Sequence, residues 1–264
     1  CVLFGRGTVS DGIENIAASH RGLFITFEGG DGAGKSTHIR FLSEALRVHG
    51  CEVVSLREPG GTRIGEKLRE VLLDPRNDDL SDQAELLVFE AARAQIVAEV
   101  IKPALDRGAV VLCDRFTDST VAYQAYGRGL SLDFVRRANE FACQGIVPDR
   151  TILLTAGGSS ASIKRATRRG ADRMERSGQE FFERVAAGFR DAAEREPDRI
   201  RVVESSGAHA DTARAVFRGL SDLFPWMADE SQCDDAYFSL INRRPARKGA
   251  DGKRSVGKHG KRGA

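Results

Sequence analysis

The sequence predicts an α/β protein with a parallel sheet and helices on both of its faces. Three observations predict this class. Short apolar runs of strand length alternate along the chain with longer segments of helical periodicity. The runs are apolar at successive residues, as strands covered on both faces are. A glycine-rich turn lies between the first run and the first helical segment.

Five short apolar runs are predicted to be the strands of this sheet. They cover residues 23–28, 53–57, 109–114, 151–154 and 200–203. Apolar residues at helical spacing, such as Ile39, Leu42 and Leu46, mark the segments between them. Helices are expected from residue 35 to about residue 50, at 64–73, from about 82 to 106, at 131–144, from beyond 177 to about 194, and at 211–224. Pro103 should bend or break the third of these helices.

Composition and charge describe an ordinary globular chain of 264 residues, with 41% hydrophobic and 30% charged residues. The net charge of +2 is unevenly spread, because residues 243–264 hold nine Lys or Arg and one Asp, which leaves about −6 on the rest. No apolar run approaches the roughly 20 residues that span a bilayer, so no membrane partner is expected. None of the five cysteines forms a CxxC pair, so we expect free thiols and a cytoplasmic location.

The glycine-rich turn carries the first chemical motif, which fits the pattern GxxxxGK[ST]. Its residues are Gly29, Gly30, Asp31, Gly32, Ala33, Gly34, Lys35 and Ser36, followed by Thr37. Glycines let backbone N–H groups converge on phosphate oxygens, and the helix that follows directs its positive end toward the same anion. Lys35 would reach the β- and γ-phosphates of ATP, and the Ser36 hydroxyl would bind Mg²⁺. Because the motif lies between a strand and a helix, it predicts a P-loop NTPase fold with an ATP site.

Further segments, in the right order, resemble the thymidylate kinases of the bacterial type. They are residues 27–37, Arg-Glu-Pro-Gly-Gly-Thr at 57–62, Phe-Glu-Ala-Ala-Arg-Ala-Gln at 89–95, Asp-Arg-Phe-Thr-Asp-Ser-Thr at 114–120, Ala-Tyr-Gln at 122–124, Pro-Asp at 148–149 and Asp-Arg-Met-Glu at 172–175. The resemblance covers about residues 22–224. It implies a nucleoside monophosphate kinase-like fold, with a five-stranded parallel sheet and a mobile lid. It also implies transfer of the γ-phosphoryl group of ATP to dTMP, with Mg²⁺, in a step of dTTP synthesis by a homodimer.

The resemblance also implies which residues hold the acceptor. Arg57 and Arg115 would bind its phosphate, for which the planar two-pronged guanidinium is suited. A structural ion pair is the alternative for each. Phe89 and Arg93 are four residues apart on one helical face and would stack on thymine and bind a base carbonyl, with core packing the alternative for Phe89. The base and sugar pocket would be completed by Thr120, Tyr123 and Gln124.

Two carboxylates stand beside the expected phosphates. Asp31 lies inside the phosphate loop, and the family uses it on the sugar hydroxyl of the acceptor or near the transferred group. Asp114 ends an apolar strand, as the acid that assists Mg²⁺ binding does in this fold. It would hold the metal directly or through water. The alternative for Asp114 is a structural partner for Arg115 or for the loop.

No arginine occupies positions 30–33 of the phosphate loop, so the resemblance implies that a lid at about 156–178 supplies the catalytic arginine. Phosphoryl transfer depends on positive charge where negative charge develops. The acceptor phosphate, whose second pKa is about 6, needs no general base. The candidates are Arg165, Arg168, Arg169 and Arg173, with Asp172 and Glu175 helping to close the lid. A solvated charged helix is the alternative.

The predicted organisation has three parts: an unassigned extension at 1–20, a kinase domain at 21–225, and a C-terminal extension at 226–264 with a basic, disordered tail. The chain departs from the family pattern at Ile96, Arg150 and Thr155, none of which is assigned to chemistry. Other functions stay open: a kinase for another pyrimidine nucleotide such as dUMP, or an inactive nucleotide-binding module. The tail could bind polyanions, although a merely solubilising tail is the simpler alternative.

Overall fold

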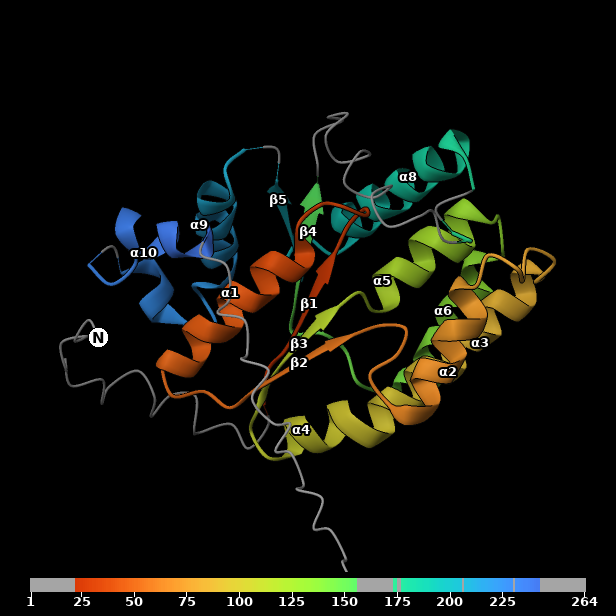
Figure 1. Ribbon diagram of the computed structural model, residues 1–264, viewed down its shortest axis with the longest axis horizontal. Helices are drawn as coiled ribbons and strands as arrows, with labels where there is room; N and C mark the ends of the chain where they lie inside the picture. The colour runs from red at the N-terminus through yellow and green to blue at the C-terminus, as the bar shows by residue number, and fades with distance from the viewer. Residues whose placement is uncertain (1–21, 156–172, 175–176, 206, 230, 243–264) are drawn as a thin grey trace, which may run out of the picture.

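The computed structural model describes residues 22–155, 173–174, 177–205, 207–229 and 231–242. A five-stranded parallel sheet forms its centre, in the order β2-β3-β1-β4-β5 (Figure 1). The strands are β1 (Phe24–Glu28), β2 (Val53–Arg57), β3 (Val110–Asp114), β4 (Arg150–Thr155) and β5 (Ile200–Glu204). The predicted parallel α/β sheet is therefore confirmed.

The register of the central strands positions the site. Phe27 of β1 pairs with Asp114 of β3, and Glu28 pairs with Leu153 of β4. Every side chain of β1 is buried, because helices cover both faces of the sheet. The carboxyl ends of β1 and β3 consequently lie side by side, and the loops that follow them leave the sheet at the same edge.

One face of the sheet is covered by α1 (Lys35–Val48) and α9 (His209–Leu220). Leu42 and Leu46 of α1 and Phe217 of α9 pack there against Ile25 and Leu112 of the strands. This cluster continues beyond α9. It includes Met227 of η4 (Pro225–Ala228), Phe238 of α10 (Asp235–Ser239), Ile241 of η5 (Leu240–Asn242), and Cys233 between η4 and α10. Side chains from residues beyond 225 thus pack into the same core as α1 and α9.

The opposite face is covered by a long helical segment and by α8 (Gln179–Arg195). The long segment consists of α3 (Asp82–Ile96), the π-helical η1 (Val97–Ile101) and α4 (Lys102–Asp106). Pro103, where a bend or a break was expected, lies in the first turn of α4, directly after the wider π-helical turn, where its missing N–H is tolerated.

A second helical layer lies beside α3 and carries much of the site. Its members are α2 (Arg63–Leu73), α5 (Thr117–Thr120), the π-helical η2 (Val121–Gly127) and α6 (Leu132–Cys143). The segment α5–η2 was not predicted, because its few apolar residues show no helical repeat. Among the described residues, no helix is long and apolar enough to cross a membrane.

The unusual Arg150 has a structural role at the start of β4. Its side chain is buried, donates to the carbonyl of Gly219 at 3.0 Å and pairs with Asp222 at 2.5 Å. Arg150 therefore ties β4 to the end of α9, on the side of the sheet away from the phosphate loop. Ile96, the second departure, is fully buried beside Gly61.

Candidate functional site

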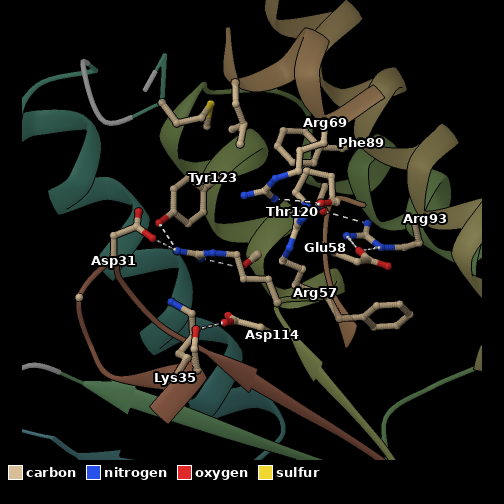
Figure 2. Close-up of a pocket in the computed structure, with 18 of the residues that line it drawn as sticks. Asp31, Lys35, Arg57, Glu58, Arg69, Phe89, Arg93, Asp114, Thr120 and Tyr123 are labelled. Atoms are coloured by element: carbon tan, nitrogen blue, oxygen red, sulfur yellow. Dashed lines mark hydrogen bonds and ion pairs between the residues drawn. The ribbon is translucent and has the colours of Figure 1, made fainter. Parts of the chain in front are cut away.

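A pocket of about 810 Å³ opens at the carboxyl edge of the sheet. The loops after β1, β2 and β3 line one part of it, and residues of α1, α2, α3, α5, η2 and α9, with Met174, line the rest (Figure 2). The predicted site residues that line it are Asp31, Gly32, Gly34, Lys35, Ser36, Thr37, Arg57, Phe89, Arg93, Asp114, Arg115, Thr120, Tyr123 and Gln124. Residues from four separate sequence segments therefore meet in one pocket.

The phosphate loop requires its glycines. Gly29 has φ 120° and would place a Cβ atom 2.1 Å from the carbonyl oxygen of Leu154, so no other residue fits there. Gly34 precedes α1 with φ 93°. Lys35 folds back over the loop, and its Nζ donates to the carbonyls of Gly29 at 3.0 Å and Gly30 at 2.9 Å. Burial, followed by the nearby Arg115, lowers the pKa of Lys35 to about 8.

Ser36 and Asp114 bring two oxygen donors together beneath the loop. The Ser36 hydroxyl donates to Asp114 Oδ2 at 2.8 Å, although 78 residues separate them in sequence. Both residues line the pocket. A hydroxyl and a carboxylate beside a phosphate loop form the donor set that Mg²⁺ prefers, so the residues present fit this metal.

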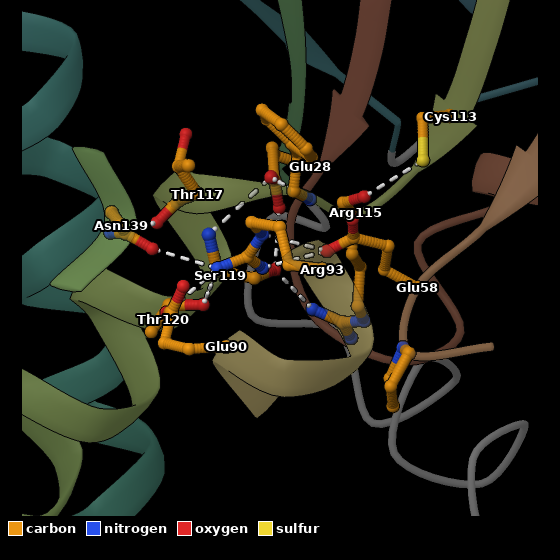
Figure 3. A network of polar contacts seen from close by, with 12 residues as sticks. Glu28, Glu58, Glu90, Arg93, Cys113, Arg115, Thr117, Ser119, Thr120 and Asn139 are labelled. Carbon is orange, nitrogen blue, oxygen red and sulfur yellow. Dashed lines mark hydrogen bonds and ion pairs between the residues drawn. The ribbon is translucent and has the colours of Figure 1, made fainter. Parts of the chain in front are cut away.

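Arg115 has an unusual backbone conformation for a residue with a side chain, with φ 71°. Three groups fix the turn around it. The N–H of Arg115 donates to Phe27 O at 2.9 Å, and the N–H groups of Phe116 and Ser119 donate to Glu28 Oε1 at 2.7 and 3.3 Å (Figure 3). Glu28 is fully buried, and this burial, with the nearby Asp118, raises its pKa to about 7.

The side chain of Arg115 reaches the phosphate loop, where it contacts Asp31. Its Nη2 donates to Asp31 Oδ1 at 2.7 Å and to Tyr123 Oη at 3.2 Å. Its Nη1 donates to Ser119 Oγ at 3.0 Å, and that hydroxyl in turn donates to Glu28 Oε2. Burial opposes ionisation of Asp31, but Arg115 and Lys35 outweigh this effect and lower its pKa. The guanidinium is thus held by a chain of contacts that begins at Glu28.

A second arginine group lies where β2 ends. Arg57 is half exposed and pairs with Glu66 of α2 at 2.9 Å. Arg57 and Arg69 both donate to the carbonyl of Pro59, at 3.3 and 2.9 Å. Arg69 was not predicted to belong to the site, because a lone arginine on an exposed helix gives no signal in the sequence. With Arg115, these residues make this part of the pocket suited to an anion.

Arg93 is almost fully buried in a polar network (Figure 3). Glu58 accepts from its Nε at 2.9 Å and from its Nη2 at 2.7 Å. Its Nη1 donates to Glu90 at 2.9 Å, to Thr120 at 2.9 Å and to Asn139 at 2.7 Å. Burial raises the pKa of Glu58 to about 7 despite this guanidinium. Arg93 therefore supports the pocket wall as well as facing the pocket beside Phe89 (Figure 2).

The expected lid residues divide into two groups. Arg165, Arg168, Arg169, Asp172 and Glu175 lie outside the described residues. Arg173 is described and buried, but it does not line the pocket. Its Nε donates to Leu72 O at 3.1 Å and its Nη2 pairs with the fully buried Glu85. In this arrangement its charge is neutralised by Glu85 rather than directed at the phosphate loop.

The sequence interpretation missed several buried polar residues that support the pocket. They are Glu28, Glu58, Glu85, Ser119 and Asn139. Glu28, Glu58 and Ser119 lie within the segments that resemble the family, and Glu28 also ends a largely apolar strand, where an acidic residue requires a buried partner. Chemically, the assembled pocket has cations and backbone N–H groups for phosphates at one end, and an aromatic side chain with an amide for a ring at the other.

Comparisons with known proteins agree with this chemistry. The family model described as thymidylate kinase matches residues 27–216. A thymidylate kinase of Pelotomaculum thermopropionicum is 49% identical over 201 residues, which are 74% of this chain and 93% of that protein. One from Pseudomonas putida is 45% identical, over 79% of this chain and 97% of that protein. The crystal structure of thymidylate kinase from Ehrlichia chaffeensis has a TM-score of 0.62 at 34% identity, covering 76% of this chain and 99% of that one.

The raised pKa of Glu28 predicts a specific dependence of stability on pH. The folded chain keeps this carboxyl protonated up to about pH 7, whereas the unfolded chain releases the proton near 4.5. Stability that Glu28 contributes is therefore complete below pH 4.5 and is lost as the pH rises through 7. Between pH 5 and pH 8 the wild type should lose up to about 3 kcal/mol more free energy of unfolding than Glu28→Gln.

Urea denaturation at the two pH values measures this difference. Glu44→Gln, on the exposed side of α1, is the matched control and should keep the wild-type dependence. Identical pH dependence in the wild type and Glu28→Gln would show that the buried carboxyl does not titrate as described.

Proposed function

Because the chain belongs to the thymidylate kinase family, we propose that its pocket is the place where the γ-phosphoryl group of ATP passes to dTMP. The chain is an ATP-dependent dTMP kinase that forms dTDP and ADP, in a step toward dTTP. Nothing in the comparisons supports a kinase for another nucleotide or an inactive binding module. One observation carries the assignment of the site: the phosphate loop, two strand-end arginines and an aromatic residue line a single pocket.

The phosphate loop is proposed to hold ATP. Its N–H groups and the positive end of α1 would bind the phosphates. Lys35 would exchange its bonds to Gly29 O and Gly30 O for the β- and γ-phosphate oxygens, a change that needs only rotation of its side chain. Ser36 and Asp114 would hold Mg²⁺, directly or through water, and the bound metal would neutralise charge on the phosphates.

The arginines at the strand ends are proposed to hold the phosphate of dTMP. Arg115 is tethered through Ser119 and is directed toward the phosphate loop, so a phosphate bound to it would face the γ-phosphate of ATP. Arg57 approaches from β2, and Arg69 lies beside it. Asp31 would release Arg115 to the phosphate and interact with the sugar hydroxyl of the acceptor or near the transferred group. The reaction then needs alignment and charge, because the acceptor phosphate is already ionised.

The thymine ring is proposed to occupy the end of the pocket lined by Phe89. Phe89 would stack on the ring, and Arg93 would approach a base carbonyl. Tyr123, Thr120 and Gln124 of α5–η2 would complete the base and sugar pocket. Thr120 already accepts a hydrogen bond from Arg93, so its hydroxyl orientation is set before the nucleotide binds.

A lid at about 156–178 remains part of the proposal. Arg165, Arg168 and Arg169 are the candidates for the cation that reaches the transferred group, and Asp172 and Glu175 would help to close the lid. Arg173 is proposed to have a different role: because it pairs with Glu85, it would fix the chain at the end of this segment. The organisation proposed is therefore a kinase domain from about residue 21 through 242, with the basic tail outside the described residues.

The assignment is tested by ADP release with Mg-ATP and a panel of acceptors. Turnover should be strongest with dTMP and weaker with dUMP, CMP, AMP and GMP. Lys35→Ala should lower kcat by about 100-fold to 1,000-fold, because it removes charge from the developing transition state. Lys102→Ala, an exposed lysine on α4 that does not line the pocket, should leave kcat within about twofold. A stronger reaction with another monophosphate would contradict the thymine site.

We further propose that the kinase forms a homodimer through α2, α3 and α6, which lie next to one another (Figure 1). These helices expose apolar side chains, among them Leu87, Phe134 and Phe141, and Phe141 is 86% exposed.

A cytoplasmic location is proposed because the cysteines among the described residues are free thiols. Polyanion binding by residues 243–264 stays a prediction.

Sedimentation velocity tests the dimer at micromolar concentration. The wild type should sediment as a dimer, and Phe141→Asp should shift it to monomer, because a charge would be buried in the interface. Val48→Asp places the same charge at an exposed apolar residue on α1 and should leave the dimer intact. A monomeric wild type, or equal effects of both substitutions, would refute this interface.

A further inference from the structure

We propose that Glu85 is a positioning residue that sets which nucleotide bases the kinase accepts, by fixing the orientation of the Gln124 amide. This inference rests on the proposed thymine site. It concerns a residue of α3 that does not itself line the pocket. Glu85 and Gln124 are both almost completely buried, at 0% and 1% exposure.

Because of its other contacts, Glu85 can only accept a hydrogen bond from Gln124. Arg128 donates to Glu85 Oε1 at 3.2 Å and to Oε2 at 3.1 Å, and Arg173 donates to Oε2. A carboxylate that serves two guanidinium groups is an acceptor and offers no proton. Gln124 must therefore turn its amide nitrogen toward Glu85, and Nε2 donates to Oε1 at 2.8 Å.

The consequence lies on the pocket side of the amide. With Nε2 bound to Glu85, the other end of the amide, Oε1, is left for a ligand. Among the described residues nothing donates to Gln124 Oε1, although Gln124 lines the pocket. The pocket therefore offers a fixed hydrogen-bond acceptor near the proposed ring site. The second hydrogen on Gln124 Nε2 can donate to a carbonyl of the ligand.

This arrangement matches one class of pyrimidine. Thymine and uracil carry a hydrogen on N3 and a carbonyl at C4, which complement an amide oxygen and an amide N–H. Cytosine has an unprotonated N3 and an amino group at C4, so it presents the opposite pattern. An amide that could turn over would suit both patterns equally. The Glu85 contact removes that freedom and so excludes cytidylate without any contact to the base.

The experiment compares kcat/KM for dTMP, dUMP and dCMP in one competition assay. A ratio of two acceptors on one enzyme sample does not depend on the fraction of folded protein. The wild type should prefer dTMP over dCMP by about 1,000-fold or more, since a mismatched buried polar pair is strongly rejected. In Glu85→Gln the preference should fall about tenfold or more. Part of this change should be an increase in kcat/KM for dCMP. The ratio of kcat/KM for dTMP to kcat/KM for dUMP should stay within about twofold of the wild-type ratio.

Further variants distinguish a changed orientation of the Gln124 amide from a general loss of stability. Arg128→Met removes a partner of Glu85 but keeps the contact between Glu85 and Gln124, so it should lower stability without changing the dTMP-to-dCMP ratio. Gln124→Met should lower that ratio, and adding Glu85→Gln to it should cause no further change, because Glu85 acts through the amide. If Glu85→Gln does not fold, Glu85→Asp keeps the charge for both arginines and should still lower the ratio through its shorter reach.

An unchanged dTMP-to-dCMP ratio in the Glu85 variants would overturn the inference, as would an equal loss of preference in Arg128→Met. Either result would leave the dTMP kinase assignment intact, since the wild type would still prefer dTMP. Failure of the wild type to phosphorylate dTMP would instead overturn the proposed function itself.

Discussion

The buried carboxyl group of Glu28 joins the two strand ends on which the pocket depends. It belongs to β1, but its hydrogen bonds go to Phe116 and Ser119, which follow β3. These bonds hold Arg115 in a left-handed conformation that a side chain rarely adopts. The guanidinium is thereby aimed at the phosphate loop, which leaves the adjacent end of β1. In the proposed mechanism, a contact in the core rather than a flexible surface loop would thus set the distance between the donor and acceptor phosphates.

Charge balance explains why so many acids surround this cationic pocket. Arg93, Arg115 and Arg173 are each largely buried and each pair with at least one carboxylate. A buried charge without a partner would be strongly destabilising, so the partners are required for folding. Where the partner lies on the pocket side, as Asp31 does for Arg115, a phosphate can take its place. Where the partner lies within the core, as Glu85 does for Arg173, the ion pair holds the wall of the pocket in place.

The sheet and the phosphate loop leave local signals, so both could be predicted from the sequence. Five apolar runs predicted the five strands, and the glycine pattern predicted the loop whose Gly29 leaves no space for a Cβ atom. The buried polar residues that support the pocket left few signals in the sequence. Glu58, Ser119 and Glu85 act through contacts across 35, 91 and 39 residues of sequence, and such pairs have no periodic pattern. The packing of Met227, Phe238 and Ile241 into the core was missed for a similar reason, because the helices that carry them are only about one turn long.

A crystal structure with dTMP and a non-hydrolysable ATP analogue tests the central claim most directly. The account predicts that Arg115 exchanges Asp31 for the dTMP phosphate, while Phe116 and Ser119 keep their hydrogen bonds to Glu28. The phosphate of dTMP should then face the γ-phosphate held by the loop and Lys35. If Arg115 stayed paired with Asp31 and the acceptor phosphate were bound elsewhere, the proposed role of the Glu28 contact in aligning the reaction would be contradicted.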